Sequence, residues 1–319
     1  MKIKGSVKNL KINSAFTVAL TGTVVALALR LYQVFSGLID FETGFFTEDS
    51  ITTVLLYGVL VLTAVAVFAI SLLSEKVPAD KLPEKKNIVI TILCAIFAVG
   101  LAMSAAPLFE DFMKTSYSYN SLYEEQTKLS FLMKSGALPK LLEGVFAVIS
   151  TIYFLLLAVK FAGAGKINLT KLKIFTLSPL FWATFRMIQR FTRTISFMNV
   201  STLFLELFMI AFMMMFFMYF AQMASEVNNR CTSYKVVSYG LIAGMFAAVV
   251  DVPKQLLSLF SEEYKLIEEA GNLACPQERA DIIFFIFVFG FVAFLISVPK
   301  IKNMTLKEAE KIIETEEEK

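Results

Sequence analysis

The side chains of this sequence with the clearest capacity for chemistry are four arginines inside otherwise apolar segments: Arg30, Arg186, Arg190 and Arg193. A guanidinium group presents a planar fork of N–H donors, which binds a carboxylate or phosphate through two hydrogen bonds. Charged side chains at membrane depth are costly, so they usually serve a site or an ion pair. These four residues therefore indicate an anionic ligand or acidic partners.

Three of the arginines share one helix face. Arg186, Arg190 and Arg193 follow an i, i+4, i+7 spacing, which places them along one side of a helix. Gln189 lies on the same side. Guanidinium groups in such a row repel one another unless anions lie between them. The spacing therefore predicts that an anion is held along this face.

Other ionisable residues fall at the same depth of the apolar segments. At a rise of about 1.5 Å per residue, all these groups lie in the outer half, or at the outer rim, of a hydrocarbon layer about 30 Å thick. Five basic residues face two acidic ones, which leaves a positive surplus. The sequence predicts an outward-facing anion site formed by Arg30, Gln33, Arg186, Gln189, Arg190, Arg193, Glu206, Asp251 and Lys254.

An alternative interpretation gives the same side chains structural roles. The outermost cations would extend to lipid phosphates of the outer leaflet, namely Arg190, Arg193 and Lys254. The deeper arginines would form interhelical ion pairs, Arg30 with Asp251 and Arg186 with Glu206. The depth of Arg30 and Arg186 favours the ligand site over this alternative.

Eight apolar stretches must position these residues. A membrane-spanning helix needs about 20 mostly apolar residues, and the chain is 57% hydrophobic. Its 32 phenylalanines against one tryptophan suit lipid-facing helices, where a ring needs no polar partner. The fold class predicted is an all-α polytopic membrane protein with eight transmembrane helices at 14–39, 51–74, 87–107, 140–163, 174–198, 202–225, 235–256 and 281–298.

Lysine and arginine alternate between the connecting segments. They are frequent in the N-terminal segment 1–13, in alternate connections and in the charged tail 299–319, whereas the connection 40–50 has none. The positive-inside rule therefore predicts both termini in the cytoplasm, with the protein in the plasma membrane. A seven-span alternative, with 174–198 on the surface, would place the lysine-rich tail outside.

The sequence also shows an internal similarity. Residues 30–35 and 186–191 share the frame R-x-x-Q-x-F. The surrounding layout also recurs, which predicts two four-helix repeats at 14–163 and 174–298. An even number of spans in each repeat makes the two copies parallel. Two long outer loops, 107–139 and 254–280, are predicted to carry amphipathic helices on the outer surface.

Several classes of chemistry are excluded by composition. The chain contains no histidine, which removes histidine-metal catalysis, bis-histidine haem and Ser-His triads. The three cysteines, Cys94, Cys231 and Cys275, form no CxxC pair and predict neither a disulfide framework nor a metal site. The net charge of +3 does not indicate nucleic acid. No cofactor is predicted, and ATP-driven activity would need a partner ATPase.

These features favour a membrane transport or solute-binding protein. Its partners would be the lipid bilayer, an anionic small molecule or lipid headgroup, and a further membrane subunit or ATPase. The alternative is a non-catalytic scaffold, sensor or assembly subunit that holds a partner through its outer loops. A lipid-processing enzyme is the weakest hypothesis, because no base or metal set is evident beyond Glu206 or Asp251. No catalytic residue is therefore assigned.

Overall fold

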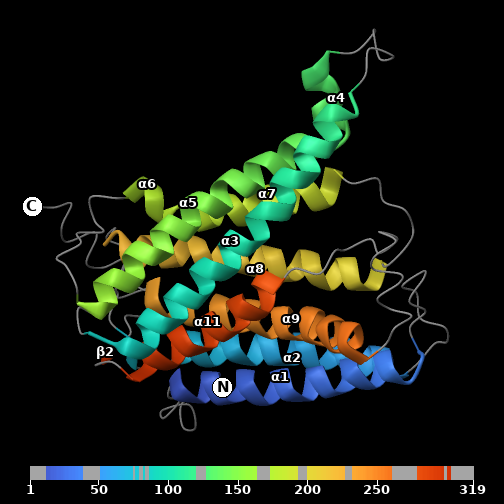
Figure 1. The fold of residues 1–319 in the computed structure, drawn as a ribbon. Helices are drawn as coiled ribbons and strands as arrows, with labels where there is room; N and C mark the ends of the chain where they lie inside the picture. Colours follow the sequence, from blue (N-terminus) through green and yellow to red (C-terminus); the bar gives the residue numbers. More distant parts are fainter. Residues whose placement is uncertain are drawn as a thin grey trace, which may run out of the picture.

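The computed structural model describes residues 12–38, 51–74, 76–78, 82, 86–119, 127–163, 173–192, 200–226, 232–260, 279–297 and 300–302. These residues are almost entirely helical, and most of the helices run side by side (Figure 1). The elements are α1 (Ile12–Phe35), α2 (Ile51–Leu73), β1 (Lys76–Pro78), α3 (Ile88–Tyr117), α4 (Lys128–Lys134), α5 (Ala137–Ala162), α6 (Lys173–Thr176), α7 (Ser178–Thr192), α8 (Val200–Ala224), α9 (Thr232–Phe260), α11 (Arg279–Ser297) and β2 (Lys300–Lys302).

Seven helices in the described part of the chain are long and apolar enough to cross a bilayer. They are α1, α2, α3, α5, α8, α9 and α11. In lipid, a helix satisfies its own backbone hydrogen bonds, so a long apolar helix is the stable form of such a segment. The chain is therefore a multi-pass helical membrane protein, and the predicted all-α membrane class is confirmed.

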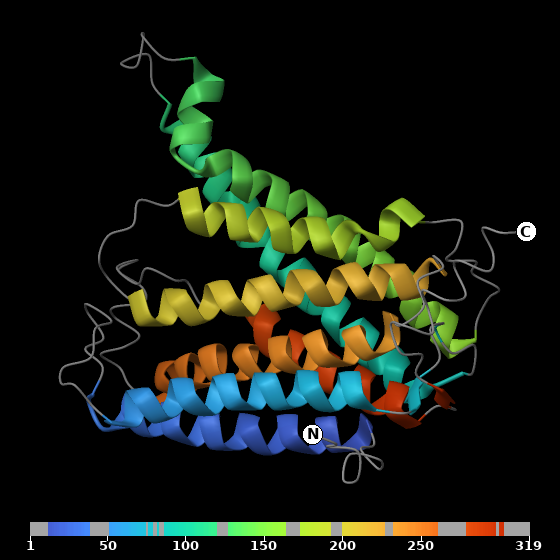
Figure 2. The same ribbon diagram turned by 180° about the vertical axis from the view of Figure 1, so that it is seen from behind.

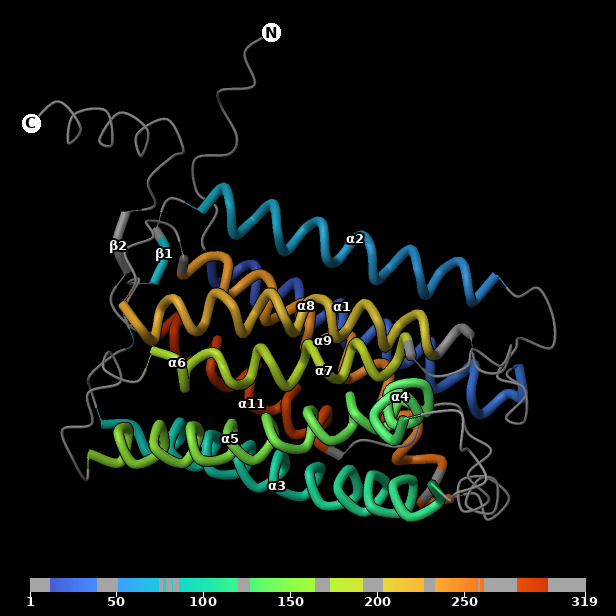
Figure 3. Tube along the Cα trace, turned by 90° about the horizontal axis from the view of Figure 1, so that it is seen from above, coloured from blue at the N-terminus to red at the C-terminus, as the bar shows by residue number. Residues whose placement is uncertain are grey.

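The helix α7 is not among those seven. The stretch 174–198 was predicted to be a span, but α7 covers 15 residues of it, or about 22 Å against a hydrocarbon layer of about 30 Å. It packs against α5 and α8 (Figure 3), and Trp182 and Arg186 on it are fully buried. α7 therefore lies within the bundle, and eight crossings stay a prediction.

The segment 107–139 differs from the outer surface loop that was predicted. α3 does not end at Pro107 but continues to Tyr117. The short α4 follows, and α3 and α5 extend together beyond the other helices (Figures 1 and 2). A salt bridge of 2.8 Å from Lys140 Nζ to Asp111 Oδ2 joins them. Of the second predicted loop, 254–280, α9 covers the start, and 261–278 lies outside the described residues.

The packing of the helices agrees only in part with two equivalent repeats. α1 packs on α2 as α7 packs on α8, and α3 packs on α5 as α9 packs on α11. However, α8 packs extensively along α9, whereas the corresponding helix α2 packs on α1 and α9 instead of on α3. The repeats 14–163 and 174–298 therefore stay a prediction.

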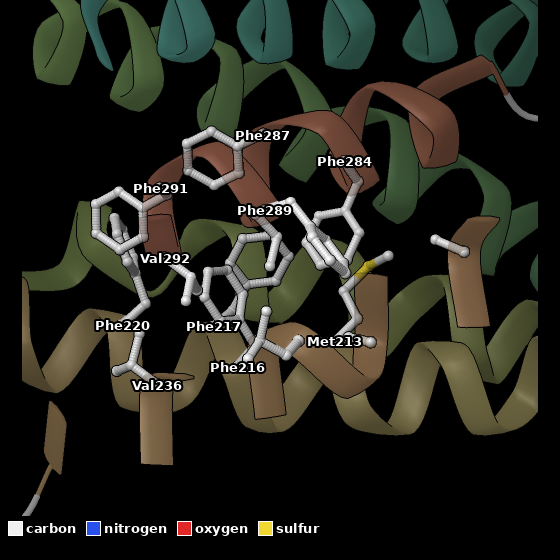
Figure 4. Close-up of a cluster of buried hydrophobic side chains, with 14 of the residues drawn as sticks. Met213, Phe216, Phe217, Phe220, Val236, Phe284, Phe287, Phe289, Phe291 and Val292 are labelled. Atoms are coloured by element: carbon white, nitrogen blue, oxygen red, sulfur yellow. The ribbon is translucent and has the colours of Figure 1, made fainter. Parts of the chain in front are cut away.

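Aromatic side chains form the centre of the bundle. Phe216, Phe217 and Phe220 of α8 lie against Phe284, Phe287 and Phe291 of α11 (Figure 4). Phe97 of α3 stacks on Phe287 with a ring-centroid separation of 4.9 Å. The phenylalanines were assigned to lipid-facing surfaces, and this assignment is wrong for these rings. They are buried against one another, and tilted and edge-to-face pairs of such rings are favourable.

A short two-stranded sheet closes one end of the bundle. β1 follows α2 and β2 follows α11, and the strands pair antiparallel with Val77 opposite Ile301. The pair lies at the end of the bundle away from α4 (Figure 1). An open sheet edge cannot face lipid, because its unpaired backbone groups need water or protein partners. The segments after α2 and α11 therefore meet on the same side of the membrane.

Candidate functional site

The interior of the described bundle contains as many acidic as basic side chains. Four basic groups are buried: Arg30, Arg186, Arg190 and Lys254. Four acidic groups are buried with them: Glu143, Glu206, Asp251 and Asp281. The sequence had predicted a positive surplus from five basic and two acidic residues. Arg193, the fifth basic residue, lies outside the described residues, and two of the acids were not expected.

Arg186 is the most completely enclosed of the cations. Both of its terminal nitrogens donate to the carboxylate of Asp281 on α11, one to each oxygen. Its Nη2 also lies 3.7 Å from Oε1 of Glu206 on α8, and its guanidinium carbon lies 5.6 Å from the centre of the Trp182 ring. The sequence had offered Glu206 as the partner of Arg186, but the two-point contact is made by Asp281.

Arg190 lies one helical turn further along α7 and forms an ion pair with a second carboxylate, that of Glu206. Its Nε and Nη2 donate to Oε1 of Glu206 at 2.9 and 2.7 Å. Its Nη1 donates to Oε1 of Gln189 at 3.2 Å. Only 3% of Arg190 is exposed. The alternative in which Arg190 extends to lipid phosphates is therefore wrong, because the side chain turns into the bundle.

The helix α9 adds an acid and a base one turn apart. Nζ of Lys254 lies 3.7 Å from Oδ1 of Asp251, which is an ion pair but too long for a hydrogen bond. The Asp251 carboxyl lies within hydrogen-bonding reach of the Asp281 carboxyl and interacts electrostatically with Glu206. Its Oδ2 has no donor among the described residues. The expected pairing of Asp251 with Arg30 is not what the structure shows.

These contacts join into one network across four helices. Its order in space is Lys254, Asp251, Asp281, Arg186, Glu206 and Arg190. The members come from α9, α11, α7 and α8, and their formal charges cancel when all are ionised. A buried ion pair costs several kcal/mol in lost hydration for each ion, and removing one partner leaves an uncompensated charge. We refer to these six residues as the charge network.

Arg30 and Gln33 belong to a separate polar group. Nη1 of Arg30 donates to Oε1 of Gln33 at 3.3 Å, and Nε2 of Gln33 donates to Thr52 of α2 at 3.4 Å. Arg30 also interacts electrostatically with Tyr57. α1 packs mainly on α2 and α9 rather than on α7. The structure thus brings together six of the nine predicted site residues around α7, and places these two at the α1–α2 contact.

Sequence reasoning missed two buried acids. Asp281 is in the first turn of α11, so it coincided with the predicted start of an apolar stretch and was taken as a boundary. Glu143 is near the start of α5 and only 1% exposed. A signal was present for both, because each is an acid within one turn of the start of a predicted span. Counting acids as carefully as bases would have found them.

The arrangement has a limited chemical repertoire. The described residues contain no group of three side chains suited to hold a metal ion. The network consists of carboxylates and cations at hydrogen-bonding or ion-pair distance. Such a network can exchange one oxyanion for another on a guanidinium fork, and it can bind or release protons at its carboxyl groups.

Comparisons with protein-family models, characterised proteins and solved structures found no match to this chain. What defines the class is therefore the structure itself: a multi-pass helical membrane protein with a buried charge network near one end of its bundle. The function is therefore inferred from the geometry of this network.

Proposed function

We propose that this chain is a membrane transport or solute-binding protein, and that its charge network holds an anionic small molecule or lipid headgroup. One observation carries the proposal. The Arg186 fork is occupied by a carboxylate from another helix. The same two-point geometry suits a carboxylate or phosphate ligand. Asp281 thus occupies the position that an oxyanion ligand would take on Arg186.

The position of the network supports a site with access from one side. Asp281 is in the first turn of α11, and Arg190 is two residues before the end of α7. Asp251 and Lys254 are in the last three turns of α9. These positions are in the half of the bundle away from the β1–β2 sheet. A ligand would reach them from the side opposite that sheet, which is the outer side if the lysine-rich sheet is cytoplasmic.

The β1–β2 pair also supports eight crossings. Both strands lie on one side of the membrane, so an even number of crossings must separate them. Between them are five of the seven span helices and α7. The number is even only when α7 crosses as well. Eight crossings would place both termini on the sheet side, where Lys76, Lys300 and Lys302 favour the cytoplasm.

This topology gives a first prediction. A reporter enzyme active only in the cytoplasm should be active when fused after Lys319 and inactive when inserted in the connection 40–50. Insertion there avoids the described helices. A fusion after Lys319 that reports the outer side would contradict eight crossings and leave α7 as a segment that enters and leaves on one side.

The second prediction tests the ligand. The purified chain in proteoliposomes should bind or take up at least one of three labelled oxyanions: inorganic phosphate, sulfate or succinate. Arg186→Lys keeps the charge but loses the fork of two nitrogens that the structure shows on Asp281 and that the oxyanion would occupy. Losing a charge-assisted contact costs about 1.5–3 kcal/mol, which is roughly a ten- to hundredfold loss of affinity.

The matched control for that experiment is Lys114→Arg. Lys114 is exposed on the projecting end of α3, and this variant should bind as the wild type does. Thermal unfolding without ligand, measured for both variants, separates a loss of binding from a loss of stability. Wild-type protein that binds none of the three oxyanions, or Arg186→Lys with wild-type affinity, would contradict the proposal.

A scaffold role is the second candidate, and the projecting α3–α5 hairpin favours it. Its outer end exposes apolar side chains, among them Met113, Tyr117, Leu129 and Met133. Exposed apolar patches of this kind often mark interaction surfaces. A scaffold would tolerate substitution of Arg30 or Arg186 in cells and would be sensitive to changes in 107–139 or 254–280. The transport proposal predicts the opposite order of sensitivity.

A further inference from the structure

Two aspartates of the charge network lie closer to each other than two ionised carboxylates would favour. Asp251 of α9 and Asp281 of α11 are 97% and 99% buried. Their carboxyl groups are within hydrogen-bonding reach of each other. An ionised carboxylate has only acceptor atoms. A contact between two such groups is therefore repulsive unless a donor lies between them.

The surrounding charged groups do not supply that donor to Asp251. On α9 itself, Lys254 remains 3.7 Å from Oδ1. Arg186 of α7 directs both terminal nitrogens to Asp281, and Glu206 of α8 adds a further negative charge. α1 and α2 also pack on α9, but the charged groups that act on Asp251 are Asp281, Lys254 and Glu206, and do not include Arg30 of α1 or Tyr57 of α2.

The atom that lacks a donor is one oxygen of the Asp251 carboxyl group. Oδ2 of Asp251 is fully enclosed and has no donor among the described residues. A buried acceptor without a donor is costly. A metal ion would need further oxygen ligands, and the described residues offer no group of three suitable side chains. A single proton shared by the two carboxyls supplies the missing donor, as it does wherever two carboxyl groups share one site.

We infer that Asp251 and Asp281 form a proton-binding site, and that an anion binds to Arg186 only while this proton is bound. This inference rests on the proposed function. When the proton is bound, an O–H bond forms on one carboxyl, and the network carries one net positive charge. Asp281 then holds Arg186 less strongly, and an oxyanion that takes its place on the guanidinium offsets the added positive charge. The proton comes from water on the open side, and no electrons are transferred.

Infrared spectroscopy of the full-length protein in lipid nanodiscs tests the site directly. At pH 7, solvated carboxyl groups are ionised, because their pKa is about 4. Any C=O stretching band of a neutral carboxylic acid must then come from a buried group. We expect such a band in the wild type, and it should shift when aspartate is labelled with carbon-13 but not when glutamate is.

Substitutions identify the residues. Asp251→Asn and Asp281→Asn should each abolish the aspartate band. Glu143→Gln is the matched control, since Glu143 is an equally buried acid on α5, and the band should remain. The label experiment uses wild-type protein, so it holds even if the aspartate variants do not fold. No band that shifts with labelled aspartate, or a band that persists in both aspartate variants, would overturn the inference.

Coupling is tested with sulfate, whose charge does not change between pH 5 and 8. If sulfate binds only when the proton is bound, its affinity should fall about tenfold for each pH unit above the pKa of the proton site in the free protein. Sulfate binding that is independent of pH would overturn the coupling and leave the proposed function intact. An aspartate band in protein that binds no oxyanion would contradict the proposed function but would still support the proton site.

Discussion

The same short motif, R-x-x-Q-x-F, occurs on α1 and on α7, and the structure uses the two copies differently. On α1, Arg30 donates to Gln33 within the motif, and Gln33 continues to Thr52 on the neighbouring helix. On α7, Arg186 reaches out of the motif to Asp281, and Gln189 accepts from Arg190. The copy on α1 makes a neutral hydrogen bond to the neighbouring helix, from Gln33 to Thr52. The copy on α7 contributes Arg186 to the centre of the charge network.

The contacts that hold the two helices differ as well. α1 approaches α2 closely at Gly22, where a methyl group would come within 2.3 Å of Thr63 Oγ1. Close approach at a small residue is a common way to pack helices in lipid, where the hydrophobic effect between helices is absent. α7 carries two buried arginines with carboxylate partners. α1 is therefore held in the bundle mainly by close packing, and α7 mainly by its ion pairs.

The largest expected effect therefore concerns α7. Arg186→Met should destabilise the protein by about 3–5 kcal/mol, because it leaves the Asp281 carboxylate buried without its cation. Unfolding in detergent, followed by tryptophan fluorescence, measures this, since Trp182 lies beside Arg186. The double variant Arg186→Met/Asp281→Leu should recover part of the loss. If the double variant is as unstable as the sum of the single ones, the pair is not coupled as described.

A smaller effect is expected from shape at α1. Gly22→Ala should cost about 1–3 kcal/mol, the usual range for overpacking a well-filled contact. Gly58→Ala on α2 is the control, because nothing lies within 4 Å of the added methyl group, and it should be close to neutral. Equal stability of the two variants would mean that α1 and α2 separate easily, and the contrast with α7 would lose its basis.

The smallest effect separates the two glutamines. Gln33→Met removes both an acceptor for Arg30 and a donor to Thr52, so we expect a loss of about 1 kcal/mol. Gln189→Met should cost less, because Arg190 keeps its two contacts with Glu206. Thermal unfolding of the two variants in one detergent gives the comparison. The reverse order would indicate that the α7 copy also relies on its glutamine.

Much of the fold follows from the sequence because a bilayer restricts the choices. Long apolar stretches become helices, and the approximate bounds of seven of the eight predicted spans could be read from hydropathy. The end of α3 could not, since Pro107 is tolerated within a membrane helix where neighbours satisfy the freed carbonyl. The aromatic core was also missed, because phenylalanine is equally apolar facing lipid or facing another helix.

The site was predictable in its residues but not in its pairing. Arg186, Arg190 and Glu206 were found because charges are rare at membrane depth. Which acid meets which arginine depends on how the helices are arranged around one another, and the sequence contains no period that reports this. Asp281 was therefore overlooked although it makes the two-point contact with Arg186.

The pairing of β1 with β2 has a consequence for biosynthesis. β1 emerges from the ribosome before β2, and residues 79–299 are made between them. At 5–20 residues per second, the interval is roughly 10–45 s. During this time β1 has no strand of its own chain to pair with, and α11 must insert before β2 is made. The sheet thus forms only after α11 has been made, so a chain that stops before β2 lacks this connection between the segments after α2 and α11.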